Sequence, residues 1–428
     1  MNKCFILICL ILLTISCAKR NVKPVAVNCD CAKATESKLK TEPTSEPTTE
    51  PKSASLIITP DYALLKPASW QDIDGLSTDD LSAAWPAWQQ SCAGLTNKVQ
   101  NNQPIWQAVC IAAKDLNEKN PSKTNNKFNN RPSTAEIIDY YTNNFDVYSA
   151  NNADGTDTGL VTGYYQPMLK GSRTKTAKFT YPLYRQPSDL ITVDLAELYP
   201  ELKFKRVRGK LVGNKLIPYA TRAQIETAAA PLAGSELVWV DDIVEAFFLQ
   251  VQGSGIIKLE NGEQMQVGYA DQNGQAYNSI GRILIERGEL TKDQAGMQGI
   301  KNWATKNPAK LQDLLNANPS YVFFRELPTG LAGPLGALGV PLTAERSVAV
   351  DPKFIPLGAP VFISTTQPNS TKPLKRLMLA QDTGGAIKGG VRADFFWGAG
   401  EEAGKQAGSM KQQGKIWVLL PKGFDFPK

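Results

Sequence analysis

Short strand-like segments dominate the chain after Gly159, and this pattern constrains the fold more than any other feature. Apolar runs such as LVTGYYQPML and GKIWVLLP alternate with glycine, proline and Asn-Gly turns, and the pairs at Asn261 and Asn273 are expected to close hairpins. The run LVWVDDIVEAFFLQVQGSGII also reads as extended. No period of roughly 20 to 50 residues recurs, which argues against solenoids and propellers. The pattern therefore predicts β-barrels rather than a doubly wound sheet.

Helical signals precede and interrupt these segments. One apolar series with alternating steps of four and three predicts a helix that Pro86 kinks or restarts, and it comprises Leu81, Trp85, Trp88, Cys92 and Leu95. Ser133 followed by Glu136 predicts a capping box at the start of another helix. Further helices are expected over residues 279–315 and near residues 401–410.

The N-terminus has the pattern of an exported, lipid-anchored protein. The apolar run from Cys4 to Ile15 is too short to span a bilayer, so residues 1–16 are interpreted as a signal peptide. Ser16 and Cys17 resemble the lipobox of bacterial lipoproteins, and an ordinary cleaved signal peptide is the alternative. Ala18 in the next position indicates the periplasmic face of the outer membrane. Residues 17–58, rich in Thr, Glu, Ser and Pro, predict a disordered tether.

Four cysteines remain outside the signal peptide and its lipid site. Cys29, Cys31, Cys92 and Cys110 allow three pairings in an oxidising compartment. Cys92 and Cys110 lie in similar helical contexts, WQQSCAGL and WQAVCIAA, so a disulfide between them is favoured.

Composition restricts the chemistry. The chain contains no histidine, which excludes Ser/His/Asp and Cys/His arrangements and most zinc and haem ligation. A net charge of +6, from 47 basic and 41 acidic residues, is too small an excess to indicate nucleic-acid binding. Asp241, Asp242 and Glu245 are interpreted as turn and helix-start residues rather than a calcium site. No metal or cofactor is expected, and acid/base chemistry must come from Asp, Glu, Tyr, Lys or Cys.

The segment QDTGGAIKGGVRADFFWG places Asp394 before Phe395, Phe396 and Trp397. A carboxyl in apolar surroundings tends to keep its proton, so Asp394 is a candidate catalytic acid. The alternative is a surface aspartate that caps a turn before a buried strand. A second Asp-Thr-Gly triplet at Asp157 suggests a pepsin-like pair with Asp382, but the two neighbourhoods are unlike each other, so a protease is not favoured.

Six ordered blocks resemble the membrane-bound lytic murein transglycosylase A family, and the likeness covers about Pro67 to Pro421. The blocks are VTGYYQP, WVDDIVEAFFLQVQGSG, YNSIGRILIERGE, NPSYVFFRE, SVAVDPKFIPLGAPVFI and QDTGGAIKGGVRADFFWGAGEEAG. The resemblance implies a mainly β (α+β) fold. A double-psi β-barrel domain with accessory N-terminal helices would comprise residues 59–166 and 333–428, a second β-barrel domain would be inserted at residues 167–332, and a groove would separate them.

The resemblance also implies a reaction. Members cleave the β-1,4 bond between N-acetylmuramic acid and N-acetylglucosamine in peptidoglycan and leave a 1,6-anhydromuramoyl end. Asp394 matches the acid/base of that family, Asp382 is expected to support it, and Asp351 is expected to fix a strand entry. Gln166 replaces a glutamate common among relatives, so no acid/base role is assigned to it.

Candidates for substrate binding are Tyr164, Tyr165, Gln250, Gln252, Ser254 and Lys388. The expected partners are peptidoglycan glycan strands, the outer membrane through the N-terminal lipid, and proteins of cell-wall synthesis or division; nucleic acid is not expected. A glycoside hydrolase on the same fold and a non-catalytic peptidoglycan-binding lipoprotein are the alternative functions.

Overall fold

The computed structural model describes residues 62–97, 104–119, 132–199, 202, 205, 207–227 and 229–426. The predicted signal peptide, Cys17, the tether, Cys29 and Cys31 lie outside these residues. Within the described ranges, no helix is both long enough and apolar enough to cross a membrane.

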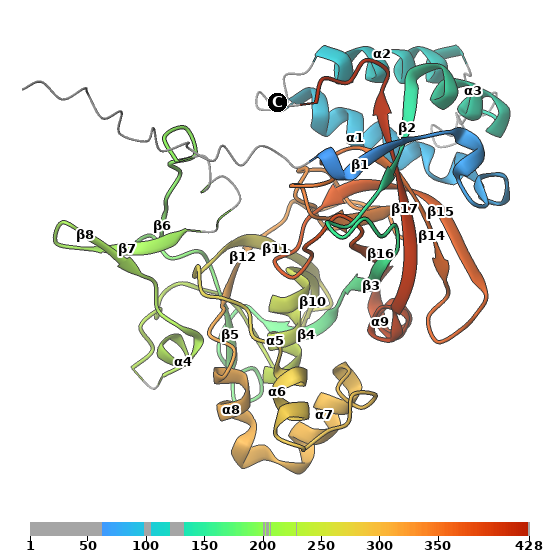
Figure 1. The fold of residues 1–428 in the computed structure, drawn as a ribbon. Coiled ribbons are helices and arrows are strands. Elements are labelled where there is room, and N and C mark those ends of the chain that lie inside the picture. The colour runs from blue at the N-terminus through green and yellow to red at the C-terminus, as the bar shows by residue number, and fades with distance from the viewer. Residues whose placement is uncertain are drawn as a thin grey trace, which may run out of the picture. The chain divides into compact units, whose positions relative to one another are not determined.

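The first barrel is built from strands at both ends of the chain (Figure 1). The strands β17, β14, β15, β13, β16 and β3 pair in that order, and a further pairing of β17 with β3 closes the ring. Two more strands, β1 and β2, extend the sheet from β17. The bounds are β1 Leu65–Ala68, β2 Phe145–Ala150, β3 Gly159–Gln166, β13 Ser347–Val350, β14 Pro360–Thr366, β15 Pro373–Asp382, β16 Ala393–Ala399 and β17 Lys411–Pro421.

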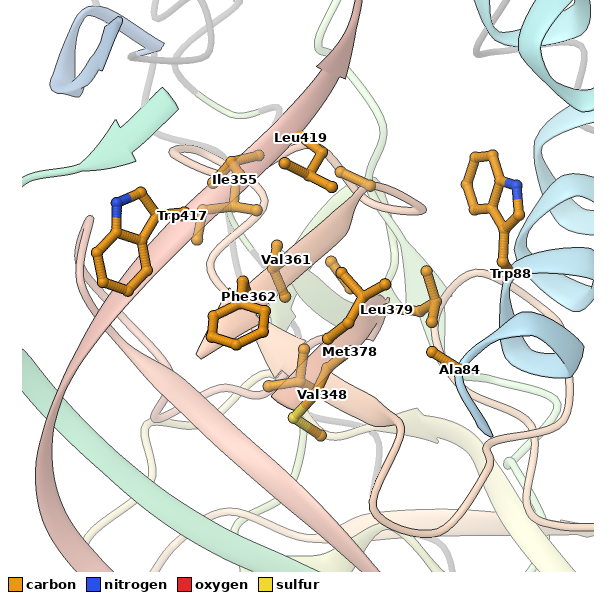
Figure 2. Packing of buried hydrophobic residues seen from close by; sticks show 14 of the residues in the cluster. Ala84, Trp88, Val348, Ile355, Val361, Phe362, Met378, Leu379, Trp417 and Leu419 are labelled. Carbon is orange, nitrogen blue, oxygen red and sulfur yellow. The ribbon is translucent and has the colours of Figure 1, made fainter. Parts of the chain in front are cut away.

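Helices from the N-terminal segment pack beside this barrel, and one helix precedes its last strand. They are the short 3-10 helices η1 Tyr62–Leu64, η2 Trp70–Asp72, η3 Leu76–Thr78 and η4 Leu81–Ala83, and the α-helices α1 Trp85–Asn97, α2 Pro104–Lys119, α3 Thr134–Asn144 and α9 Gly400–Ser409. The buried core contains residues of both layers, among them Trp88 from α1 and Phe362 and Trp417 from the barrel (Figure 2). These helices and the barrel therefore share one core.

The residues between β3 and β13 form a second sheet, ordered β12-β11-β10-β4-β9-β5, in which β12 also contacts β5. A small three-stranded sheet, β6-β7-β8, belongs to the same segment. The strand bounds are β4 Met168–Ser172, β5 Tyr181–Tyr184, β6 Ile191–Thr192, β7 Arg208–Val212, β8 Lys215–Pro218, β9 Glu236–Val240, β10 Ser254–Leu259, β11 Gln264–Gln272 and β12 Val322–Glu326. The helices are α4 Arg222–Ile225, α5 Ile243–Gln252, α6 Ile280–Glu286, α7 Met297–Lys306 and α8 Pro308–Asn316.

Two helix predictions from local sequence are confirmed. Helix α1 begins at Trp85 after the separate turn η4, so Pro86 lies in its first turn, where a proline is tolerated. Ser133 caps α3: its hydroxyl accepts from the backbone N–H of Glu136, whose side chain in turn accepts from the backbone N–H of Ser133. Both orphan donors at this helix end are thereby satisfied.

Two local predictions are wrong. The run IVEAFFLQVQ forms helix α5 rather than a strand, because Asp242 accepts from the N–H groups of Val244 and Glu245 and Gly253 ends the helix in the left-handed conformation. Asn261 turns the hairpin β10–β11 as expected, but Asn273 makes no hairpin. Its buried side chain instead bonds the backbone of Ala220, Pro319 and Tyr321, which holds three segments together.

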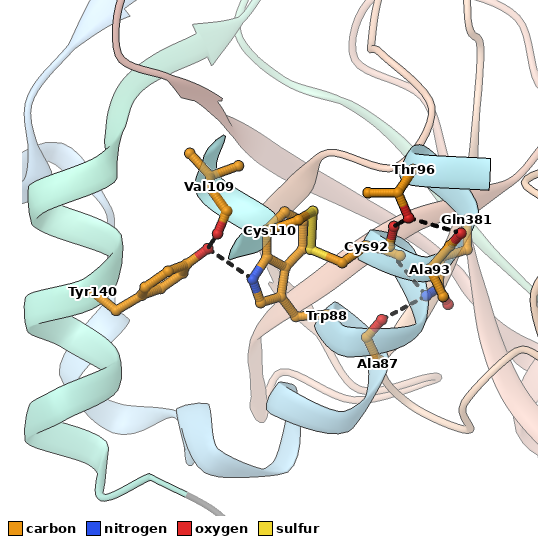
Figure 3. Close-up of a disulfide and its surroundings, with 10 residues drawn as sticks. Ala87, Trp88, Cys92, Ala93, Thr96, Val109, Cys110, Tyr140 and Gln381 are labelled. Atoms are coloured by element: carbon orange, nitrogen blue, oxygen red, sulfur yellow. Dashed lines mark hydrogen bonds between the residues drawn. A yellow bond between two sulfur atoms is a disulfide. The ribbon is translucent and has the colours of Figure 1, made fainter. Parts of the chain in front are cut away.

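A disulfide joins α1 to α2 through Cys92 and Cys110, the pair favoured from the sequence (Figure 3). Beside it, the indole N–H of Trp88 donates to the Tyr140 hydroxyl at 3.0 Å, and that hydroxyl donates to the Val109 carbonyl at 2.8 Å. The three N-terminal α-helices are therefore tied together by one covalent bond and one hydrogen-bond chain.

We predict that replacing Cys92 and Cys110 together by alanine lowers the free energy of unfolding by about 3 kcal/mol, because the bond closes a loop with a sequence separation of 18. Urea unfolding measures this change. The matched control replaces Cys29 and Cys31 by alanine and is expected to leave the midpoint unchanged; equal stability of both variants would contradict the prediction.

Candidate active site

Asp394 lies on the strand β16, which pairs in parallel with β3. The register places Asp394 opposite Thr162 and Phe396 opposite Tyr164. Since alternate residues of a strand share one face, these four side chains belong to the same face of the two strands. Thr162 donates a 2.6 Å hydrogen bond from its hydroxyl to Asp394 Oδ1, and the rings of Tyr164 and Phe396 are in contact with centroids 5.1 Å apart.

A close approach of β3 to the next layer requires glycine at position 163. A Cβ atom built there would lie 2.7 Å from the Trp397 indole nitrogen and 2.9 Å from the Ala407 Cα atom. Both distances are shorter than real Cβ contacts, so any side chain at this position would push β3 away from the Trp397 side chain of β16 and from helix α9. Gly163 thus fixes the depth at which Thr162 and Tyr164 lie.

Asp382 lies at the end of β15, on the other side of β13 from Asp394. Ala349 of β13 pairs with Asp394 on one side and with Asp382 on the other. Neighbouring strands lie about 4.8 Å apart, so the two aspartate backbones are separated by roughly 10 Å. Ala349, between them, is buried in one apolar cluster with Tyr164 and Phe396.

Burial dominates the electrostatics of Asp394. Burial raises the pKa of its carboxyl from 3.8 to about 6; the Thr162 hydrogen bond and the positive charge of Arg392 oppose this shift, and the charge of Asp382 adds to it. Within the described part of the chain, Oδ2 accepts no hydrogen bond. The arrangement gives a half-buried acid whose pKa is raised toward neutral pH and which has one oxygen without a hydrogen-bond partner among the described residues.

Asp382 has a more crowded environment. Its Oδ2 accepts from the Tyr164 hydroxyl at 3.0 Å, and its Oδ1 accepts from the backbone N–H groups of Ala337 and Thr383, both at 2.9 Å. Burial raises the pKa of Asp382, and these three donors lower it in part. Because both oxygens are engaged by the protein, Asp382 is placed to hold Tyr164 and the following loop rather than to contact a reacting atom.

The residue before Asp382 anchors this strand end to the N-terminal helices. Gln381 is fully buried, and its amide nitrogen donates to the Ala87 carbonyl at 2.8 Å and to the Ser91 hydroxyl at 3.0 Å (Figure 3). Helix α1 thereby fixes β15 directly before the carboxyl group that faces the site.

Asp351 anchors the glycine loop that joins β15 to β16. It follows β13, so the structure corrects the expectation of a strand entry to a strand exit. Its carboxylate accepts from the Gly389 N–H at 3.1 Å and lies 3.6 Å from the Lys388 ammonium. Lys388 is more than half exposed, so its charge remains accessible beside the loop.

The other predicted substrate-binding residues differ in exposure. Gln252 and Ser254 are half-buried at the end of α5 and the start of β10, and the Gln252 side chain accepts from the backbone N–H of Tyr165. The Tyr165 ring is buried against helix α9, and its hydroxyl bonds the Met297 sulfur. Gln250 is buried as well, and its oxygen accepts a 2.6 Å hydrogen bond from Arg222.

A pocket of about 690 Å³ adjoins the glycine loop. Its walls come from the small sheet, from the segment after β11 and from the loop itself, and they include Arg208, Gln275, Tyr277, Gly385 and Lys388. Amide, phenol and cationic groups thus surround an open space. The glycine loop between Asp382 and Asp394 forms one edge of this space. Neither Asp382 nor Asp394 is among its lining residues, so the groove expected between the two barrels stays a prediction.

The acidic segment before α5 has structural partners. Asp242 caps the helix, and Glu245 forms an ion pair with Lys301 of α7. Within the described ranges, no three metal-binding His, Cys, Asp or Glu side chains are gathered at one place. Gln166, the position without an assigned acid/base role, is buried, and its amide nitrogen has no hydrogen-bond partner in the described part of the chain.

Sequence reasoning missed Thr162 and Ala349. Strand register places Thr162 beside the Asp394 carboxyl and places Ala349 between Asp382 and Asp394. Neither residue type indicates a functional site by itself. The block VTGYYQP contained Thr162, but only the pairing of β3 with β16 shows that its hydroxyl reaches Asp394.

Comparison with known proteins identifies the relatives of this chain. A family model described as the MltA specific insert domain matches residues 160–325, and a model of the 3D domain matches residues 346–420. Membrane-bound lytic murein transglycosylase A of Escherichia coli (strain K12) is 36% identical over 282 residues, which cover 64% of this chain and 69% of the relative.

Solved structures that resemble this chain come from the same family as the sequence relatives. MltA from Neisseria gonorrhoeae is 35% identical with a TM-score of 0.69, covering 85% of this chain and 94% of that one. The lytic transglycosylase LtgG of Burkholderia pseudomallei is 46% identical with a TM-score of 0.54, covering 84% and 96%. E. coli MltA with bound chitohexaose is 28% identical with a TM-score of 0.57, covering 79% and 90%. The chain therefore belongs to the membrane-bound lytic murein transglycosylase A family, and its predicted fold of a double-psi β-barrel with an inserted second barrel is confirmed.

Proposed function

We propose that this protein is a peptidoglycan lytic transglycosylase in which Asp394 acts as the only acid/base. The observation that carries the proposal is the carboxyl itself: its pKa is raised to about 6 by burial, and its Oδ2 atom accepts no hydrogen bond from the described residues. Family membership supports the substrate class, since a relative with this fold binds chitohexaose, a β-1,4-linked amino-sugar chain.

In the first step, Asp394 donates its proton from Oδ2 to the glycosidic oxygen of the bond between N-acetylmuramic acid and N-acetylglucosamine. The bond from that oxygen to the anomeric carbon breaks, and the N-acetylglucosamine side leaves as an alcohol. Positive charge develops on the sugar ring, and the Asp394 carboxylate produced in this step lies beside it.

In the second step, the C6 hydroxyl of the muramic acid attacks the same anomeric carbon. Asp394 takes the hydroxyl proton, which restores the acid and leaves a 1,6-anhydro ring. The substrate supplies its own nucleophile, so a second free carboxylate is not required. This fits Asp382, whose two oxygens are occupied by Tyr164 and two backbone donors.

The glycan is proposed to lie in the pocket beside the glycine loop. Tyr277 offers an exposed ring for sugar stacking, and Gln275 and Lys388 offer donors for hydroxyl and acetamido oxygens. Gln252 and Ser254 are the other predicted contacts that remain solvent-accessible. Tyr164, Tyr165 and Gln250 are buried, and we propose that they act by supporting these groups.

We predict that Asp394→Asn releases no anhydromuropeptides from purified peptidoglycan sacculi. Asparagine keeps an oxygen that accepts from Thr162 but carries no transferable proton. Mass spectrometry of the digest is the measurement, because hydrolysis would add one water that the anhydro product lacks. Anhydro products from the variant would refute the assignment of Asp394, and reducing muramic acid ends from the wild type would make the protein a hydrolase.

The free energy of unfolding of Asp394→Asn is also predicted to differ from that of the wild type in a pH-dependent way. The pKa of Asp394 is raised on folding, so its ionisation disfavours the folded state: the cost is absent below pH 4 and complete above about pH 6. Asp394→Asn is therefore expected to be more stable than the wild type at pH 8, by up to about 3 kcal/mol, and equally stable at pH 3.5. Denaturant unfolding at both pH values is the check, and it also shows whether lost activity reflects misfolding.

Activity is predicted to depend on pH through the acid form of Asp394. As pH rises above about 6, the protonated fraction falls, and kcat/KM is expected to decline tenfold per pH unit. The initial rate of anhydromuropeptide release between pH 4.5 and 8.5 measures this limb. A rate that stays constant from pH 5 to 8 would contradict the raised pKa.

We further propose that Cys17 carries a lipid that holds the protein at the outer membrane. The support is the lipobox-like sequence and the membrane-bound relatives. Cys17→Ala is expected to move the exported protein from the membrane fraction to the soluble fraction, as judged by immunoblotting of fractionated cells. Cys29→Ala is the matched control and is expected to remain with the membrane; an unchanged distribution of Cys17→Ala would remove the proposal.

A further inference from the structure

Arg392 contacts the hydroxyl group that bonds the candidate acid. Its guanidinium donates to Thr162 Oγ1 at 2.9 Å and to the Leu160 carbonyl at 3.3 Å, and a further bond reaches the Ala393 carbonyl. The same Thr162 hydroxyl donates to Asp394 Oδ1 at 2.6 Å. Arginine, threonine and aspartate thus form one chain of hydrogen bonds across the paired strands β3 and β16.

A hydroxyl carries a single hydrogen, so its direction depends on its neighbours. A threonine hydroxyl beside a protonated carboxyl can either donate a hydrogen bond to it or accept a hydrogen bond from it. The guanidinium has donors only and cannot accept. Once Arg392 donates to Thr162 Oγ1, the threonine hydrogen is directed toward the remaining acceptor, Asp394 Oδ1.

We propose that Arg392 is a positioning residue for the reaction: by donating to Thr162 it orients that hydroxyl onto Asp394 Oδ1, so that the transferable proton of Asp394 resides on Oδ2. The inference rests on the acid role proposed for Asp394. Without the arginine, the acid proton could turn toward Thr162, where it would be unable to reach a glycosidic oxygen.

The charges around Asp394 agree with this role. Asp382 on β15 raises the pKa of Asp394, Arg392 directly before β16 lowers it, and β13 contributes the uncharged Ala349. On β3, burial keeps the pKa of Tyr164 well above its ordinary value, so that phenol remains a neutral donor. Among these groups, Arg392 is the one positive charge that opposes retention of the proton, and it allows the acid to return as a base in the second step.

The alternative is a purely structural role, in which Arg392 only holds β3 against β16 through its hydrogen bond to the Leu160 carbonyl. In that case its loss would lower stability and reduce activity whether or not Thr162 is present. The charge of Arg392 acts on the pKa of Asp394 in either case, but only a positioning role depends on Thr162. The two roles are therefore distinguishable by a double-mutant cycle.

The first experiment titrates the full chain labelled with ¹³C at aspartate Cγ, with the Asp394 signal assigned from its absence in Asp394→Asn. Arg392→Met is expected to raise the Asp394 pKa by about one unit, because a nearby positive charge and an ordered donor are both lost. This readout requires no turnover, so it remains valid whatever reaction the protein catalyses. An unmoved Asp394 titration in Arg392→Met would overturn the inference.

The second experiment measures anhydromuropeptide release. Arg392→Met and Thr162→Val are each expected to reduce the rate on the order of tenfold, and the double variant is expected to be little slower than Thr162→Val alone, because the arginine acts through the threonine. Thr162→Ser retains the hydroxyl and is expected to preserve the rate. Losses that multiply fully in the double variant would also overturn the inference.

Arg376→Met is the matched control. It removes an arginine whose partner, Glu345, is a partly exposed surface carboxylate, and it is expected to leave both readouts unchanged. Should Arg392→Met fail to fold, Arg392→Lys replaces it: lysine keeps the positive charge and can donate to Thr162, but it lacks the planar fork through which Arg392 bonds Thr162 and Leu160 together. A near-wild-type titration and rate in Arg392→Lys would support positioning, whereas an unmoved titration with a lowered rate would favour a strand fastener. Inactivity of the wild type itself would count against the proposed function, not against the hydrogen-bond order.

Discussion

The pairing of β3 with β16 is the interaction on which the site depends. The two strands run in parallel, although Thr162 and Asp394 are separated by 232 positions in the chain. Parallel strands always need a crossover connection, and here that connection contains the whole inserted barrel, β13, β14 and β15. The acid therefore acquires its hydrogen-bond partner only after distant parts of the chain have met, so an isolated C-terminal segment would carry Asp394 without its environment.

The barrel makes its two central carboxyl groups unequal. Both flank Ala349, and burial raises the pKa of each. Asp382 is held by three donors that occupy both oxygens, whereas Asp394 receives one donor on one oxygen. The difference arises from position along the chain: Asp382 ends a strand, where backbone N–H groups are unpaired, and Asp394 begins one whose backbone is already paired on both sides. Strand pairing therefore leaves Asp394 with the oxygen that can act.

Sequence patterns predicted the parts of the fold that depend on local chemistry. The Ser133 cap, the restart at Pro86 and the cysteine pair each follow from neighbouring residues. Helix α5 was missed because IVEAFFLQVQ is apolar on almost every side, which removes the helical period, and its signals were only the terminal Asp242 and Gly253. Asn273 was misinterpreted because an Asn-Gly pair signals a hairpin only if the asparagine side chain has no better partner in the folded protein.

The residues of the candidate site likewise divide into those that local sequence predicts and those that depend on tertiary structure. Asp394 and Asp382 could be predicted because an unusual run of glycine and aromatic residues surrounds them. The family resemblance then predicted Asp394 as the acid/base and Asp382 as the supporting residue. Thr162 and Ala349 owe their places to strand register, which a single sequence does not encode locally. Lys388 and Gln252 are at least partly exposed, whereas Tyr165 and Gln250 are buried, although all four occur in blocks that match the family.

The raised pKa of Asp394 explains how a chain without histidine can use one group for both proton transfers. At pH 7, an aspartate with an ordinary pKa would be protonated in only about one molecule in a thousand, whereas a pKa of about 6 leaves roughly one in ten ready to donate. A still higher pKa would fill the acid form but make the proton harder to release, since acid strength falls as pKa rises. Burial beside Phe396 and Asp382 pushes the value up, and Thr162 and Arg392 limit the rise. An aspartate placed between these opposing contacts can donate first and accept afterwards, which is the role that histidine fills in many other enzymes.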